Sequence, residues 1–190
     1  MSEQQLLRWR VYFAALVVLG ELAHLTWEHF NGGVVSHHIL NRADLPAISN
    51  WFGALLLPAL AWFLTGRIQR RIASYSGWRK AASKFPTSVV VGFFGSLVFG
   101  MLLSVSFTNG YENISSYLFV SMLLSALLLP VYRPECVLGF ILGMTFTFGA
   151  VLPTAIGSIV AAISAVIHLV VRPVLVHAWT RLKRVPSPNA

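Results

Sequence analysis

Residues 9–44 read WRVYFAALVVLGELAHLTWEHFNGGVVSHHILNRAD, an apolar run that passes into a dense group of ionisable side chains. Four of the six histidines and three of the six acidic residues of the chain lie between Glu21 and Asp44. Ionisable groups at the end of an apolar segment are costly to place in a membrane, so by default they mark a functional site. The stretch therefore predicts a membrane-spanning helix together with a site that the helix carries.

The composition of the whole chain is that of an integral membrane protein. Of its 190 residues, 56% are hydrophobic and 11% are charged, whereas soluble domains carry about 25% charged residues. The single cysteine, Cys136, excludes an internal disulfide and a thiolate metal cluster. We expect an all-α fold, a polytopic transmembrane helical bundle that forms one domain over residues 1–184, with a disordered tail at 185–190.

Six apolar segments are long enough to cross a membrane, because a helix needs roughly 17 to 25 residues to span a hydrocarbon core of about 30 Å. The expected spans are residues 9–29, 46–66, 86–108, 114–132, 136–152 and 154–171. The last two form a nearly continuous run, so they are separate spans only if Pro153 sits in a tight turn. A re-entrant hairpin over residues 136–171 is the alternative.

The basic residues predict the orientation of the bundle. Thirteen of the 14 lysines and arginines lie at the two ends of the chain or in the connections that follow the second and fourth segments, and only Arg42 lies on the other side. The positive-inside rule then places both termini in the cytoplasm. This distribution also decides against nucleic acid as the partner of a chain with net charge +8. Short loops with basic flanks are typical of a bacterial inner membrane protein, whose partners are membrane lipids.

Residues 67–85 combine basic side chains with apolar ones at three- and four-residue steps. That pattern predicts a helix lying on the cytoplasmic membrane surface.

Small residues recur every four positions in three of the predicted spans. Such faces let helix backbones approach closely in lipid, within one chain or between copies in a homo-oligomer. The residues are Gly92, Ser96, Gly100 and Ser104, then Gly139, Gly143 and Thr147, and finally Gly157, Ala161 and Ala165.

A polar stripe is expected on the outer half of the first helix. Each helical residue advances about 100°, so Glu21, His24 and Glu28 fall within about 60° of one another. Histidine titrates near neutral pH, and a histidine beside a carboxylate can act as general acid and base. The candidate catalytic residues are therefore His24, Glu28 and Glu21.

The same region could instead bind a divalent metal, zinc or iron. A catalytic zinc needs three protein ligands and one open position, and Gly32 and Gly33 would let the chain fold back over the helix. The candidate ligands are His24, Glu28, His37, His38 and Asp44. A di-iron bundle would need a second Glu-x-x-His motif, and neither Glu112 nor Glu135 is followed by a histidine three residues on.

Three functions are compatible with these residues. The first is a membrane-embedded enzyme, with or without a metal ion, that acts on a lipid or another apolar small molecule. The second is a small transporter or a proton- or metal-handling protein, although few polar residues mark a path to the cytoplasm. The third is a non-catalytic membrane subunit or assembly factor, in which the site is only a polar network: Glu21 with His24, Glu28 with Arg42, and Asp44 capping the second helix. We expect His29 and Arg42 to be structural in each case.

Overall fold

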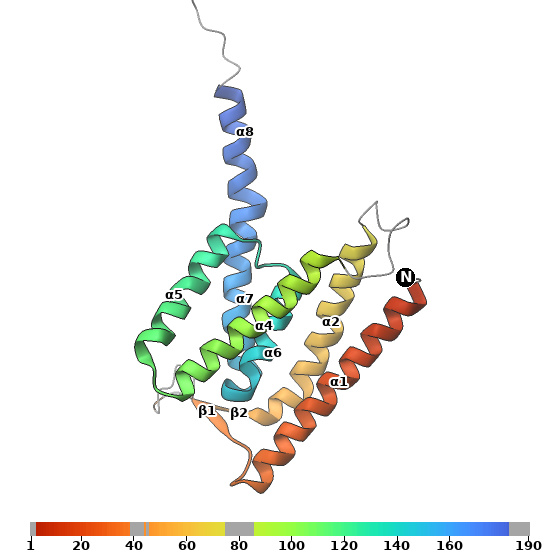
Figure 1. Cartoon of the computed structure of the whole chain (residues 1–190), viewed down its shortest axis with the longest axis vertical. Helices are drawn as coiled ribbons and strands as arrows, with labels where there is room; N and C mark the ends of the chain where they lie inside the picture. Colours follow the sequence, from red (N-terminus) through yellow and green to blue (C-terminus); the bar gives the residue numbers. More distant parts are fainter. Residues whose placement is uncertain (1–2, 39–43, 45, 75–85, 183–190) are drawn as a thin grey trace, which may run out of the picture.

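The structure, a computed structural model, describes residues 3–38, 44, 46–74 and 86–182, and in this part of the chain it is built from helices and one small β-hairpin (Figure 1). The all-α prediction is confirmed. The main helices are α1 (Glu3–Phe30), α2 (Gly53–Ala73), α4 (Thr87–Thr108), α5 (Glu112–Leu128), α6 (Pro134–Phe148) and α7 (Val151–Val166). A π-helical turn, Ile167–Val171, joins α7 to α8 (Arg172–Leu182). Strands β1 (Ser36–His38) and β2 (Ala47–Ser49) pair antiparallel, with His37 opposite Ile48.

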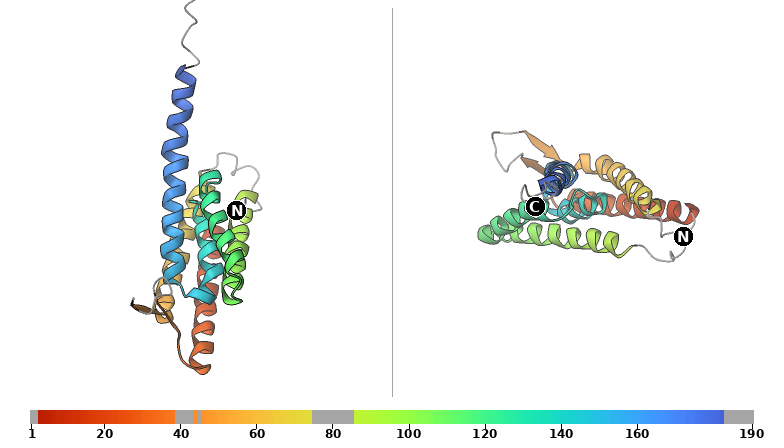
Figure 2. Two further views of the ribbon diagram at one scale, coloured as in Figure 1. Left: turned by 90° about the vertical axis from the view of Figure 1, so that its left-hand side faces the viewer. Right: turned by 90° about the horizontal axis from the view of Figure 1, so that it is seen from above.

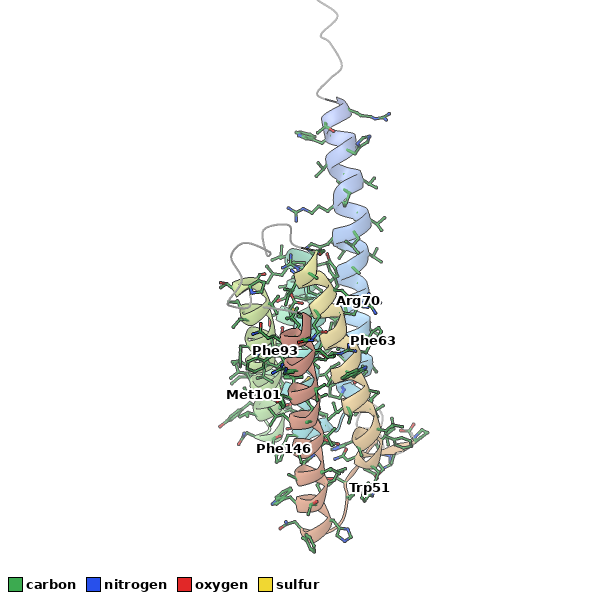
Figure 3. The ribbon with its side chains drawn as sticks, turned by 90° about the vertical axis from the view of Figure 1, so that its right-hand side faces the viewer. Trp51, Phe63, Arg70, Phe93, Met101 and Phe146 are labelled. Carbon is green, nitrogen blue, oxygen red and sulfur yellow. The ribbon has the colours of Figure 1, made fainter. Side chains whose placement is uncertain are left out.

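Successive helices from α1 to α7 run in opposite directions, and α8 continues α7 (Figure 1). The two ends of the bundle differ chemically. One end holds the N-terminus, the last turns of α2 and the base of α8, and we call it the basic end because Arg8, Arg67 and Arg70 lie there. The other end holds the last turn of α1 and the β-hairpin, and we call it the hairpin end. In Figure 3, Trp51 and Arg70 mark the hairpin end and the basic end of the α2 region.

Helix α6 lies at the centre of the bundle. Seen from above, it lies between α4 on one side and α2 and α7 on the other (Figure 2). Its side chains Leu138, Ile141 and Met144 are almost fully buried and belong to the apolar core. Its 15 residues measure about 22 Å at 1.5 Å per residue, less than the roughly 30 Å of a bilayer core. Many of its apolar side chains are buried among the other helices.

Three helices in the described part of the chain are long and apolar enough to span a membrane. They are Asn50–Ala73, Thr87–Thr108 and Val151–Arg181, and α5 and α6 are apolar but shorter. These helices fit an integral membrane protein.

Close contact between α4 and α6 confirms the prediction from their small residues. A Cβ atom added to Gly100 would lie 2.8 Å from the carbonyl oxygen of Phe140 and 3.2 Å from the Cα of Gly143. A Cβ on Gly139 would collide with the backbone of Phe93. The Ser104 hydroxyl donates across the same interface to the Gly143 carbonyl at 3.3 Å. Glycine therefore brings the two backbones into direct contact.

The predicted start of the second span at residue 46 is wrong. Ala47–Ser49 forms strand β2, Asn50–Phe52 forms a 3-10 turn, and α2 begins only at Gly53. Asp44 is therefore too far away to cap α2, whose first turn has no side-chain cap. Pairing with β1 holds residues 47–49 extended, and this overrides their apolar character.

The predicted surface helix over residues 67–85 is also wrong for its first part. Helix α2 continues to Ala73, and Ile68 and Ile72 are buried in the apolar core. Residues 75–85, Arg42 and the predicted tail at 185–190 lie outside the described residues.

The turn between the fifth and sixth segments lies at Gly149, four residues before its predicted place at Pro153. Gly149 has a φ of +66°, which glycine adopts without strain. Pro153 instead lies in the first turn of α7, where proline is tolerated because its missing N–H would have no partner there. Helix α7 then runs on through the π-helical turn into α8, past the predicted end at residue 171.

The glycine contact between α4 and α6 predicts that Gly143→Ala lowers the free energy of unfolding by about 1–3 kcal/mol, because the added methyl group overpacks the interface. Its Cβ would lie 3.0 Å from the amide nitrogen of Met101. Gly95→Ala, on α4, is the matched control, since a Cβ there meets nothing within 4 Å. Unfolding in detergent micelles measures both variants. Equal stability of the two would contradict the role assigned to Gly143.

Candidate functional site

The predicted polar stripe of α1 lies at the hairpin end and faces the interior. Glu21 and Glu28 are only 5% and 4% exposed, and the imidazole of His24 is 9% exposed. Buried polar groups are stable only when they are paired. The contacts of these three side chains therefore define the site.

The ring of His24 lies between the two carboxylates. Its Nε2 atom is 3.4 Å from Oε1 of Glu28, one turn further along α1, and its Nδ1 atom is 3.9 Å from Oε2 of Glu21. Both separations are within the range of an ion pair if the ring is protonated. The helical spacing predicted from the sequence therefore brings these three groups together.

Two donors from outside α1 hold the Glu28 carboxylate. The side-chain amide of Asn50 donates to Oε1 at 2.7 Å, and the backbone N–H of Val35 donates to Oε2 at 3.2 Å. The backbone N–H of Asn50 donates in turn to the Val35 carbonyl at 3.0 Å. Glu28 thus fixes the end of α1 to the hairpin and to the 3-10 turn that precedes α2.

Two glycines allow the chain to return to Glu28. Gly32 and Gly33 have φ values of +115° and +103°, which other residues rarely adopt. The Gly33 N–H donates to the backbone carbonyl of Glu28 at 3.0 Å and closes the end of the helix. The hinge predicted from these glycines is confirmed.

Two further glycines provide space for the polar side chains. A Cβ added to Gly53, the first residue of α2, would collide with Oε1 of Glu21. A Cβ on Gly149, between α6 and α7, would collide with the side-chain oxygen of Asn50 and lie 3.5 Å from the ring of His37. The site therefore lies where α1, β1, the start of α2 and the α6–α7 turn meet.

His37 joins the site from strand β1. Burial lowers the pKa of His37 below its ordinary value of 6.5, the nearby Glu28 carboxylate acts in the opposite direction, and His24 reinforces the lowering. His38, the next residue in the strand, is exposed, as expected because neighbouring strand residues point to opposite faces. Folding back over α1 was predicted for both histidines, and the structure brings only His37 to the site.

The other candidate ligands are not gathered around His24. Asp44 is exposed. His29, which we expect to be structural, is also exposed, and its ring lies 5.5 Å from that of Phe30. Among the residues that the structure describes, no group of three or more histidine, cysteine or acidic side chains is arranged to hold a metal ion. The metal set of His24, Glu28, His37, His38 and Asp44 stays a prediction.

Aromatic side chains cover the outer side of the His24 ring. The ring of Phe146, from α6, lies 5.0 Å from the imidazole and 6.0 Å from the ring of Trp27. Phe146 and Trp27 are 67% and 56% exposed, and Figure 3 shows Phe146 beside α1. An apolar surface therefore leads from outside the bundle to the histidine.

Several polar residues of the structure were missing from the sequence interpretation. Asn50 was taken as part of an apolar span, although an amide inside such a span is itself a signal of function. At the basic end, Arg71 of α2 pairs with Glu135 of α6, which is fully buried. This pair was not expected, because a charge beside an apolar segment usually marks the membrane surface.

Comparisons of the chain with protein-family models, with curated proteins and with solved structures find no significant match.

The contact between Asn50 and Glu28 predicts that Asn50→Asp lowers the free energy of unfolding by roughly 3 kcal/mol, the scale for a buried charge without compensation. The substitution replaces the donor to Glu28 with a second carboxylate. Asn109→Asp is the control, because Asn109 lies exposed at the end of α4, where its side-chain amide donates to the Val105 carbonyl. Unfolding in detergent at neutral pH measures the stability of both variants. An equal loss of stability in the two would contradict the contact assigned to Asn50.

The lowered pKa of His37 predicts a fall in stability on acidification. The unfolded chain takes up the proton at about pH 6.5, before the folded protein does, so stability decreases as the pH falls from that value through the folded pKa of His37. His37→Gln should flatten this decrease relative to the wild type. Melting temperatures at several pH values measure the effect, and parallel curves for the two proteins would contradict it.

Proposed function

We propose that this protein is a small membrane-embedded enzyme that uses His24, Glu28 and Glu21 for acid–base chemistry on a lipid or similarly apolar substrate. The observation that carries the proposal is the placement of one imidazole between two buried carboxylates, beside an exposed aromatic surface.

The proposed topology has six spans and cytoplasmic termini. The basic end would face the cytoplasm, in agreement with the positive-inside rule. The hairpin end, and with it the site, would then face outward. In a bacterium this is the periplasmic side of the inner membrane.

The three side chains would have different tasks. His24 would exchange a proton with the substrate, since its side chain is the most exposed of the three and lies next to Phe146. Glu28, fixed by Asn50 and by the Val35 N–H, would orient the ring and stabilise its protonated form. Glu21, on the other side of the ring, would serve as the second proton acceptor. Trp27 and Phe146 would receive the apolar part of the substrate.

The interior of the bundle favours an enzyme over a transporter. A transporter needs polar groups between the hairpin end and the basic end. Below the site, α2 and α6 contribute Leu57 and Ile141 to an apolar cluster with Ala150. Further along the same helices, Leu64, Ile68 and Leu138 form a second apolar cluster. Protons or ions would have to cross both clusters to reach the Arg71–Glu135 pair.

The catalytic proposal predicts that the purified protein, reconstituted with a lipid extract of its own membrane, changes at least one lipid species detected by mass spectrometry. His24→Ala and Glu28→Gln should abolish the change. His29→Ala should keep it, because His29 is an exposed histidine of the same helix outside the stripe. A change that survives His24→Ala, or no change with the wild type, would contradict the proposal.

Elemental analysis separates acid–base chemistry from metal chemistry. The proposed mechanism predicts that protein purified without chelators contains no stoichiometric zinc or iron. The comparison is a His24→Ala, His37→Ala double variant. Stoichiometric metal in the wild type that is lost in the double variant would establish the predicted metal site and overturn the metal-free mechanism.

A further inference from the structure

Helix α8 extends past the rest of the bundle at the basic end, in line with α7 (Figures 1 and 2). The continuous helix Val151–Arg181 has 31 residues and measures about 46 Å, whereas a bilayer core is about 30 Å thick. Residues 151–171, which form α7 and the π-helical turn, already measure about 31 Å. Helix α8 therefore begins where the membrane-spanning part of this helix would end.

The apolar side chains of α8 gather on one face. Four of them are exposed and, at about 100° per residue, fall within about 140° of one another. They are Val174, Leu175, Ala178 and Trp179. His177 and Thr180 lie on the opposite half of the helix, and the exposed Val176 lies outside the apolar face. An apolar face with polar residues opposite it is typical of a helix that lies in a membrane surface.

Arginines flank this apolar face on both sides. Arg172 and Arg181 lie about 20° beyond its two edges. From such positions a long side chain keeps its stem on apolar surface and its charge among head groups. Residues 136–190 contain no aspartate or glutamate. A second copy of α8 on this face would bring like charges together, whereas an anionic membrane surface would attract both arginines.

The chain can bend where α8 begins. The Arg172 N–H donates to the carbonyl of Ile167, five residues back, which is the spacing of a π-helix. The next residue, Pro173, has no N–H with which to continue this ladder. Helices bend at prolines and at π-helical turns. Helix α8 can therefore leave the line of α7 and turn into the plane of a membrane.

We propose that α8 bends at Pro173 and lies on an anionic membrane surface at the basic end. Leu175 and Ala178 then face the acyl chains, and Arg172 and Arg181 lie among the head groups. Anionic lipids give a leaflet a net negative potential that attracts basic residues. A surface of phosphatidylcholine, whose head group is neutral overall, has no such attraction and holds α8 less tightly.

Electron paramagnetic resonance of the full-length protein in vesicles tests this position. Nitroxide labels are attached to Leu175→Cys, His177→Cys, Ala178→Cys or Thr180→Cys in a Cys136→Ser background. In vesicles of equal parts phosphatidylglycerol and phosphatidylcholine, we expect oxygen, which concentrates in the bilayer, to relax the labels at 175 and 178 most strongly. A water-soluble nickel chelate should relax those at 177 and 180. Relaxation of all four labels by the chelate would overturn the proposal, as would shielding of 175 and 178 from both reagents by a protein contact.

Substitutions in α8 test the face and the charge separately. Leu175→Asp should move the label at Ala178→Cys from the bilayer into water. Val176→Asp makes the same change of charge outside the apolar face, so it is the control and should leave the label in place. Arg172→Gln should lower the ratio of membrane-bound to free α8 about fivefold. Equal effects of the two aspartates, or equal binding of α8 to vesicles with and without phosphatidylglycerol, would overturn the proposal.

Discussion

The arrangement at the hairpin end depends on one buried carboxylate, that of Glu28. Glu28 is only 4% exposed, so the protein itself must supply the partners of its carboxylate. It does so from two other parts of the chain, the Val35 N–H and the Asn50 amide. The contacts of the Glu28 carboxylate therefore position the hairpin and the start of α2. They also position the His24 ring, which contacts the same oxygen, Oε1, as the Asn50 amide.

The two ends of the bundle pair their buried acidic side chains in different ways. At the hairpin end, two acids share one histidine, and Glu28 also accepts hydrogen bonds from Asn50 and Val35. At the basic end, Glu135 is buried against Arg71, and its second oxygen has no partner within the described part of the chain. The central helix α6 links these ends through an apolar stretch that contacts α4 through glycines. In the described part of the chain, the buried carboxylates thus lie toward the two ends of the bundle.

Sequence periodicity predicted much of this arrangement. The helical step places Glu21, His24 and Glu28 on one face in any helix, and four-residue spacing makes Gly139 and Gly143 a contact face in any close pair. Six apolar segments became helices for the same reason. The pattern could not predict two long-range contacts. These are the pairing of Ala47–Ser49 with β1 and the hydrogen bond from Asn50 to Glu28. The choice of Gly149 over Pro153 for the turn depends on a positive φ, which no periodicity reveals.

The central claim is that the His24 ring lies between two carboxylates. Solid-state NMR in lipid bilayers tests it directly, with ¹⁵N in the histidine rings and ¹³C in the glutamate carboxyl groups. The account predicts short-range dipolar coupling from both ring nitrogens to glutamate carboxyl carbons, and the loss of these signals in His24→Gln. Spectra without such coupling, or with coupling that persists in His24→Gln, would contradict the account.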